Sequence, residues 1–331
     1  VTRCPAGGCQ PTTATRAIVI THGWNSNAFN WVEEMALATC GRLASAQTYP
    51  FAEDSNSLTL VCWNDLWHVW ILDWKDQAFA PSFPEALPWS AWANAESVGI
   101  ELGLKLGLLN SYQHYHLIAH SAGSRVIDKA TEVLGSNPDI HLTFLDAFDP
   151  SASMSPSSLL RHESDYGENA DWVDNYVDTR LLGFEVLAVT LPDDIPEVLV
   201  KLEQLDTSDL LLPNGFNIDV NGNSLNPTCL TDCRHSRPYR FYGKSMNIGF
   251  ADDPLDPIPS AGAPPSVGVM GFPRSLEGGS SMNALASSKG RECRMQDDTT
   301  CVDTSWTPGF FTYFPGAIKE SATTLVAGEV D

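Results

Sequence analysis

The stretch that decides the fold lies before the middle of the chain. It reads Tyr115-His116-Leu117-Ile118-Ala119-His120-Ser121-Ala122-Gly123. Residues 115–118 predict a short buried strand, which the small residues around Ser121 end abruptly. A helix is predicted to follow from about Ser124 to Leu134. Small residues two positions before and after a serine are what a sharp strand-to-helix turn requires.

Further strands and helices are predicted on both sides of this turn. Strands are expected at 17–20, 58–63, 69–72 and 141–145, and helices at 28–45 and 93–109. This alternation predicts an α/β fold with a mostly parallel central sheet and helices on both faces. His22, Ser121 and Asp146 each directly follow a predicted strand. We therefore expect them at the carboxyl edge of the sheet, where such folds gather reactive residues.

Composition and charge limit the class of protein. The chain has 331 residues, of which 43% are hydrophobic and 18% charged, as in globular proteins. We expect a main domain over residues 1–250 and a Pro/Gly/Ser-rich extension over 251–331 that packs on it. No apolar run reaches the roughly 18 residues of a membrane span. The net charge of -22 excludes nucleic acid as a partner, and we expect a monomer.

The cysteines indicate the compartment. Pairing sequence neighbours among the eight cysteines predicts the disulfides Cys4–Cys9, Cys40–Cys62, Cys229–Cys233 and Cys293–Cys301. Disulfides form in oxidising compartments, so we expect a secreted protein; buried free thiols in a cytosolic protein are the alternative. The start at Val1 has no signal-peptide core and is interpreted as a mature or trimmed end. The spacing does not suggest zinc.

Ser121 has the sequence context of a nucleophile. A serine on a strained strand-to-helix turn presents its hydroxyl at the edge of the sheet, whereas the alternative is a serine that caps a helix. Acyl transfer also needs backbone N–H donors for the developing oxyanion. The loop His22-Gly23-Trp24 and the residue after the serine would supply them through the N–H groups of Trp24 and Ala122. An ordinary turn is the alternative for this loop.

The general base follows by elimination. In hydrolases with this turn, the acid and then the histidine follow the serine in the chain. Five of the eight histidines precede Ser121. Of the others, His141 lies in a predicted strand, and His162 follows Asp146 too closely to return to the serine. His235 remains as the predicted base, with a surface histidine as the alternative.

The acid and the substrate contacts are predicted from position. Asp146 ends the strand after the nucleophile helix and is the predicted acid, with Asp178 and Asp149 as alternatives. It would orient the histidine and stabilise the imidazolium. Trp70 and Trp74 lie on or next to a predicted strand and are assigned to the core. The candidate substrate contacts are His22, Phe79, Phe83 and Trp89, the last three among prolines in a predicted loop.

Together these stretches resemble the animal pancreatic lipase family, including its phospholipase branch, over roughly residues 16–245. The matching stretches are Ile20-Thr21-His22-Gly23-Trp24, Leu72-Asp73-Trp74-Lys75, the Ser121 turn, Phe144-Leu145-Asp146, 173–178 and Cys233-Arg234-His235-Ser236-Arg237. The resemblance implies the α/β-hydrolase fold and a triad of Ser121, Asp146 and His235. No metal or nucleotide is required. A structural calcium is compatible with the family, although its ligand spacing is not clearly kept over 161–171.

The chain also departs from the family. The family's lid lies in a disulfide-closed loop before the catalytic histidine, but only three residues separate Cys229 from Cys233. Residues 181–213 are longer than the family's loop and could form a substitute flap. The last 80 or so residues are too few and too irregular for the family's C-terminal lipid-binding β-sandwich. An open site favours soluble esters, phospholipid acyl chains or accessible polyester over triglyceride at an interface.

The expected function is that of a secreted serine carboxylic ester hydrolase that forms an acyl-enzyme. The alternative from another class is an inactive lipase-like module that binds lipid or a protein partner.

Overall fold

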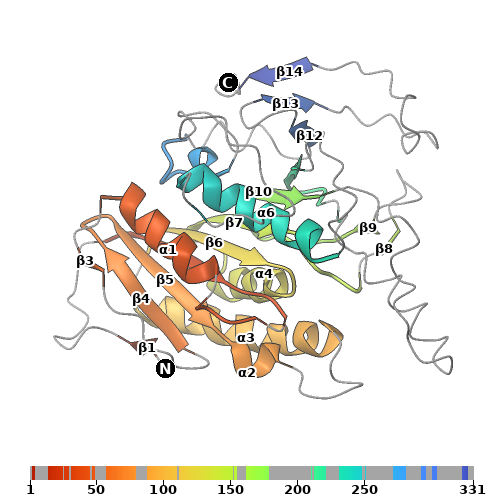
Figure 1. The fold of residues 1–331 in the computed structure, drawn as a ribbon. Helices are drawn as coiled ribbons and strands as arrows, with labels where there is room; N and C mark the ends of the chain where they lie inside the picture. Colours follow the sequence, from red (N-terminus) through yellow and green to blue (C-terminus); the bar gives the residue numbers. More distant parts are fainter. Residues whose placement is uncertain are drawn as a thin grey trace.

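The computed structural model describes the strands and helices around the Ser121 turn and much of the chain that joins them. The described residues are 2–3, 14–24, 26–29, 31–44, 47–48, 57–79, 88–109, 112–151, 153–154, 162–178, 210, 212–220, 231–247, 250, 271–280, 292–295, 300–303 and 323–326. Within them the chain forms one large sheet with helices packed on it (Figure 1).

The centre of the sheet is parallel, as predicted. In spatial order, its central strands are β5 (Trp67–Asp73), β2 (Arg16–Thr21), β6 (His114–His120), β7 (Asp139–Leu145), β10 (Trp172–Val177) and β11 (Phe216–Asp219). Beyond β5 lies the antiparallel strand β4 (Ser57–Trp63), which also pairs with β1 (Thr2–Arg3) and β3 (Gln47–Thr48). A separate hairpin pairs β8 (Ser153–Met154) with β9 (His162–Glu163).

Three strands after residue 250 belong to the same sheet. The strand β12 (Glu292–Met295) pairs parallel with β11, and β13 (Thr300–Asp303) and β14 (Thr323–Val326) continue antiparallel. The short helix η2 (Phe272–Arg274) buries Phe272 completely in the core. The extension 251–331 therefore contributes strands to the sheet, which its Pro/Gly/Ser-rich sequence did not indicate.

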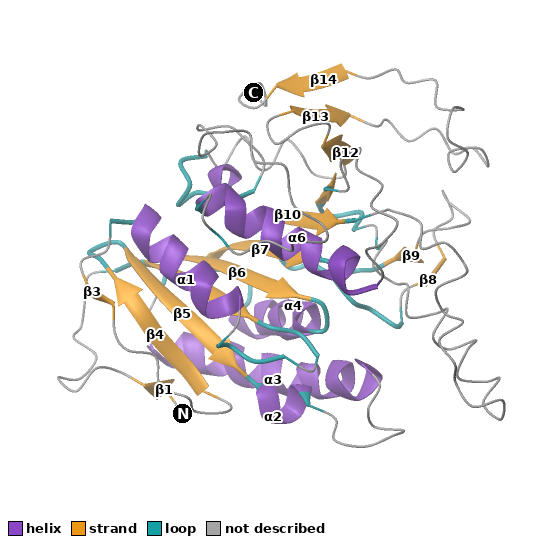
Figure 2. Ribbon diagram, in the orientation of Figure 1, coloured by secondary structure: helices purple, strands orange, loops and turns teal. Residues whose placement is uncertain are grey.

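Helices cover both faces of the sheet, as predicted. On one face lie α2 (Lys75–Ala78), α3 (Pro88–Leu109) and α4 (Gly123–Leu134). On the other lie α1 (Trp31–Arg42) and α6 (Thr231–Met246) (Figure 2).

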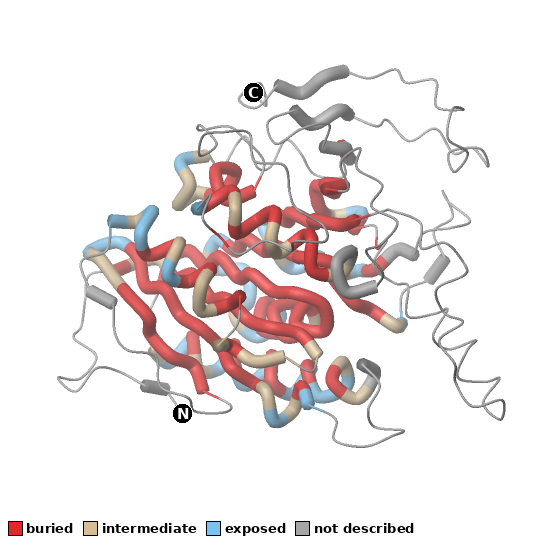
Figure 3. The backbone as a smooth tube through the Cα atoms, viewed as in Figure 1, coloured by how far each residue is buried: buried red, intermediate tan, exposed pale blue. Residues whose placement is uncertain are grey.

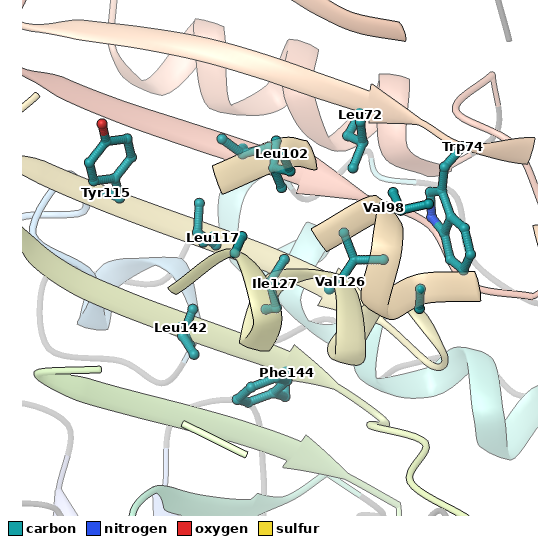
Figure 4. Packing of buried hydrophobic residues seen from close by; sticks show 14 of the residues in the cluster. Leu72, Trp74, Val98, Leu102, Tyr115, Leu117, Val126, Ile127, Leu142 and Phe144 are labelled. Atoms are coloured by element: carbon teal, nitrogen blue, oxygen red, sulfur yellow. The ribbon is translucent and has the colours of Figure 1, made fainter. Parts of the chain in front are cut away.

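The two apolar cores follow from the two-residue period of a strand. In β6, Tyr115 and Leu117 point into the core under α3 and α4, shown in Figure 4, whereas Ile118 points into the core under α1. Both faces of the central strands are buried (Figure 3). Such strands need apolar residues on both faces, which explains the continuous apolar run at the end of β2.

Some predicted boundaries are wrong. The predicted helix 28–45 is the shorter α1, and the predicted helix 93–109 begins earlier, at Pro88. Proline is favoured in the first helical turn because it has no N–H to satisfy and its φ suits a helix. Trp89 thus lies in the first turn of α3 and not in a loop.

One predicted disulfide is confirmed. Cys40 of α1 and Cys62 of β4 are bonded, with their Cα atoms 6.1 Å apart. Cys293 is buried and also disulfide-bonded. Cys4, Cys9 and Cys229 lie outside the described residues, as do the side chains of Cys233 and Cys301. The pairs Cys4–Cys9, Cys229–Cys233 and Cys293–Cys301 stay predictions, as does the flap over 181–213, of which 181–209 and 211 lie outside the described residues.

Candidate active site

Three turns that follow parallel strands meet at one edge of the sheet. β5, which follows β2 in the chain, pairs with one side of β2, and the later strand β6 pairs with its other side. The strand order therefore reverses at β2, which makes this a topological switch point. Open α/β sheets bind ligands outside the carboxyl ends of their strands at such a point. Gly23 follows β2, Ser121 follows β6 and Asp146 follows β7.

Ser121 adopts a strained backbone conformation. Its φ of 55° lies in the left-handed region, which costs a residue with a side chain about 1–3 kcal/mol. Neighbouring backbone holds it there: the Ser121 N–H donates to the carbonyl of Leu145 at 3.2 Å, and the N–H of Phe148 donates to the carbonyl of Ser121 at 3.3 Å. The turn is thus braced by β7 and by the loop that follows it.

Two glycines allow the loops after β2 and β6 to touch. A Cβ at Gly23 would lie 2.6 Å from Cβ of Ser121 and 2.7 Å from the carbonyl oxygen of His120. A Cβ at Gly123 would lie 2.4 Å from the carbonyl oxygen of His22. Because no side chain fits in these spaces, both positions require glycine. The loop that carries Trp24 therefore lies directly against the serine.

The predicted oxyanion donors are unoccupied by protein groups. Across the part of the chain that the structure describes, the N–H groups of Trp24 and Ala122 donate to no acceptor. Ala122 is the residue that precedes α4, where backbone N–H groups have no partner within the helix. Among the described residues, no protein acceptor competes for either group.

Asp146 and His235 come together although they are far apart in the chain. Nδ1 of His235 hydrogen-bonds to Oδ2 of Asp146. The carboxylate is fully buried, whereas the imidazole is 41% exposed. Asp146 also has a positive φ of 54°, and its N–H donates to the carbonyl of Tyr176 at 2.8 Å. Asp146 is thus held by neighbouring backbone, and part of the His235 side chain is exposed.

The alternative acids lie in other contacts. Asp149 accepts hydrogen bonds from the hydroxyl of Ser151 at 2.6 Å and the hydroxyl of Ser164 at 2.5 Å, so it braces the loop after β7. Asp178 is buried just beyond β10. The ring of His235 hydrogen-bonds to Asp146. This arrangement favours Asp146 over both alternatives.

The serine and the base are connected through His120. Among the described contacts, no hydrogen bond joins the Ser121 hydroxyl to His235. Such contacts are often long in enzymes without substrate and tighten when it binds. Nε2 of His120 lies 2.7 Å from the carbonyl oxygen of His235, and the two rings lie 4.4 Å apart between centroids. The residue before Ser121 therefore contacts His235 directly.

The interpretation of His22 as a substrate contact is not supported by its surroundings. Its side chain is fully buried, with Nε2 2.9 Å from Oδ1 of Asp73 and Nδ1 2.9 Å from the carbonyl of Gly23. Trp74 donates its indole N–H to the carbonyl of His22 at 2.8 Å. Since the ring is enclosed by protein groups, His22 supports the Gly23 loop from the interior of the protein.

Sequence reasoning missed Asp73, Trp74 and His120 as parts of this site. Asp73 ends β5, and Trp74 follows it. Asp73 and Trp74 lie at the end of a predicted strand, as His22 does, and this shared position could have placed them in the site.

The aromatic rim is only partly described. Phe79 is 56% exposed just after α2, which follows the carboxyl end of β5, so it is accessible on the same side as the site. Phe83 lies outside the described residues, and the position of Trp89 in α3 removes it from the predicted loop. Trp70 and Trp74 are buried in the core, as predicted.

In the described ranges, no group of three or more histidine, cysteine or acidic side chains is arranged to hold a metal ion. A structural calcium, expected around 161–171, stays untested, because residue 161 and the side chains of 162–163 lie outside those ranges. None of the described helices is both long enough and apolar enough to cross a bilayer.

Comparison with known proteins identifies no relative: no family model matches the chain, and no curated protein matches its sequence.

Proposed function

We propose that the protein is a serine hydrolase that cleaves carboxylic esters, with Ser121 as nucleophile, His235 as general base and Asp146 as the acid. The observation that carries this proposal is a strained serine at the switch point of the sheet that contacts the Gly23 loop, near a hydrogen-bonded pair of a buried aspartate and a partly exposed histidine. Strained backbone conformations in proteins cluster at active sites and ligand-binding sites.

The roles follow from the geometry. Asp146 accepts a hydrogen bond from Nδ1–H of His235, which leaves Nε2 free to take the proton of the Ser121 hydroxyl. The serine oxygen attacks the ester carbonyl carbon, and the electron pair of the C=O bond moves to oxygen. The N–H groups of Trp24 and Ala122 stabilise this oxyanion, each by roughly 3 kcal/mol. Collapse expels the alcohol, which takes the proton from His235.

The second half of the reaction uses the same groups. Water gives a proton to His235 and attacks the acyl-enzyme, and the acid is released as Ser121 regains its proton. Since Asp146 is fully buried, its charge acts on the imidazolium through a medium of low dielectric. No step needs a metal or a nucleotide.

We extend the proposal to fold and compartment. The turn at Ser121, its position in the sheet and the order serine–aspartate–histidine support an α/β-hydrolase fold. The motifs that resemble the pancreatic lipase family support a divergent member of that group. The Cys40–Cys62 disulfide supports secretion into an oxidising compartment. We propose soluble esters, phospholipid acyl chains or polyester as substrates.

The test is the Ser121→Ala variant, assayed on a short-chain chromogenic ester. Removal of this one hydroxyl should lower turnover by roughly 10⁴-fold or more while the fold is retained. Ser124→Ala is the matched control, because this buried hydroxyl has no partner among the described residues, and it should keep wild-type turnover. A fluorophosphonate should label wild type and Ser124→Ala but not Ser121→Ala, as read by mass spectrometry.

Two outcomes reject the proposal. If a folded Ser121→Ala variant keeps a tenth of the activity, Ser121 is not the nucleophile. If the wild-type protein neither cleaves esters nor reacts with the fluorophosphonate, it is not a serine hydrolase, and a binding module becomes the better interpretation.

A further inference from the structure

His120 contacts the base through the backbone of the base. Nε2 of its ring lies 2.7 Å from the carbonyl oxygen of His235. A carbonyl oxygen can only accept, so Nε2 of His120 must carry a proton and donate it to this bond. His120 precedes the nucleophile in the chain, and His235 lies in the first turns of α6. One hydrogen bond thus links the turn that carries the serine to the helix that carries the base.

The surroundings of His120 hold its ring in place. The edge of the ring meets Trp31 of α1 and Tyr239 of α6, with centroid distances of 5.8 Å and 5.1 Å. Trp31 and Tyr239 are themselves stacked at 4.8 Å. Tyr239 lies four residues after His235, so it is on the same side of α6. His120 is therefore enclosed by the two helices that cover this face of the sheet.

His120 is neutral in these surroundings. Burial removes its ring from water and lowers its pKa well below the usual value, and the nearby His235 lowers it further. The other titratable or charged groups that face it are His22, Tyr239 and Arg240. With Nε2 protonated and the ring neutral, Nδ1 carries no proton.

We propose that His120 is a positioning residue for the reaction: its Nε2–H holds the His235 carbonyl and so sets the place of the base relative to Ser121. This inference rests on the proposed function. It also explains how the base is located without a direct hydrogen bond to the serine in this structure. Because His120 is uncharged, it does not oppose the positive charge that His235 gains when it takes the proton.

The experiment compares His120→Leu with His120→Gln. Leucine removes the donor, whereas the side-chain amide of glutamine can place an N–H near the position of Nε2. For a base displaced by a fraction of an ångström, we expect kcat in His120→Leu to fall about tenfold to a hundredfold, with KM nearly unchanged. His120→Gln should recover most of kcat.

The control is His114→Leu. His114 is a buried histidine on the same strand and the same side of the sheet, and neither of its ring nitrogens has a partner among the described residues. It should keep wild-type kcat, which separates loss of the His120 bond from general damage to β6. If His120→Leu keeps kcat, or if His120→Gln is folded and as impaired as His120→Leu, the N–H does not position the base.

A measurement on the wild-type protein does not depend on the variants. The ¹⁵N chemical shifts of the His120 ring should show protonated Nε2 and bare Nδ1 from about pH 5 to pH 8. Titration within that range, or protonated Nδ1, would overturn the inference. A wild-type protein without esterase activity would instead reject the proposed function, whereas an active wild type with an unaffected His120→Leu variant rejects only the role of His120.

Discussion

At the scale of single residues, the candidate site depends on two strained turns. Ser121 and Asp146 have φ values of 55° and 54° although neither is glycine. They end the neighbouring strands β6 and β7, and each is held by hydrogen bonds to an adjacent strand or loop. Each sharp turn places its side chain at the carboxyl edge of the sheet. The strain is therefore the local cost of presenting the serine and the aspartate side by side.

The first prediction concerns the acid. An amide at position 146 keeps the shape of the side chain but favours the wrong tautomer of His235, which is worth about 10⁴ in turnover. We expect Asp146→Asn to lose this much kcat on a short-chain ester. Asp178→Asn, a buried amide substitution just beyond β10, serves as the matched control and should lose far less.

Circular dichroism should first show that both variants are folded. If Asp178→Asn is then the slower enzyme, the acid follows β10, and the pairing of His235 with Asp146 is not the reactive one.

At the scale of elements, β6, the Ser121 turn and α4 form one unit whose limits are local. α4 begins at Gly123, directly after the turn, and ends at Leu134. Gly135 follows with a φ of 71°, and its N–H donates to the carbonyl of Thr131 at 3.0 Å, a common way to end a helix. α4 packs on α3 and on β6, so the helix after the nucleophile is fixed on two sides.

A buried carboxylate on α4 yields the second prediction. Asp128 accepts the N–H of Gly167 at 3.0 Å, and its burial raises its pKa to about 6. Because the folded-state pKa lies above the ordinary value of 3.8, ionisation costs stability as pH rises from about 4 through 6. Asp128→Asn keeps an acceptor oxygen and removes this cost, so it should be more stable by about 1–3 kcal/mol at pH 8.

Urea unfolding at pH 8, 6 and 4 measures this difference, which should vanish near pH 4. The exposed Asp165, in the turn that Gly167 belongs to, supplies the control Asp165→Asn, with no gain expected. A gain of equal size at every pH would mean that the charge of Asp128 is not its cause.

At the scale of the whole molecule, the segment 271–280 covers a polar part of the sheet. Glu277 is fully buried and contacts Nδ1 of His116, whose Nε2 lies 2.8 Å from the hydroxyl of Thr143. The rings of His116 and His141 are stacked at 4.0 Å, and Nε2 of His141 lies 3.1 Å from Oδ2 of Asp174. Buried charges are tolerated only when they are paired. These pairs join residues after 270 to the central strands.

The third prediction is a loss of stability in acid to which this cluster contributes. Burial alone would raise the pKa of Glu277, but the adjacent His116 outweighs it and the pKa is lowered to about 2. Burial lowers the pKa of His141 to about 4 and that of His114 to about 3. In each case the unfolded chain binds a proton more readily. Stability should therefore fall as pH drops from about 6.5, first through the histidines and below about 4.5 also through Glu277.

His114→Leu removes one of these titrating groups and so tests its share of the loss of stability. The variant should lose less stability than wild type between pH 6.5 and 4, by up to about 1 kcal/mol per pH unit. Above pH 7 the difference in stability between the two proteins should hardly change with pH. Urea midpoints measured at pH 7.5, 5.5 and 4.5 provide the comparison, and parallel decline of both proteins would show that His114 does not contribute.

The sequence by itself determined the features that depend on neighbours in the chain. The order of apolar strands and helices predicted a parallel sheet with helices on both faces. Small residues around Ser121 predicted the sharp turn, because only small side chains fit there. Since the carboxyl ends of parallel strands share one edge, positions after the strands also predicted that Ser121 and Asp146 lie near each other. His235 followed only from chain order and elimination.

Only the tertiary structure decided the contacts between distant segments. The enclosure of His22 by Asp73 and Trp74, the bond from His120 to the His235 carbonyl and the pairing of β12 with β11 have no local signature. A buried polar group can be satisfied by any suitable partner that packing brings near, so residue type alone does not name that partner. For this reason the sequence indicated which residues could react, whereas the fold decided which residues hold them in place.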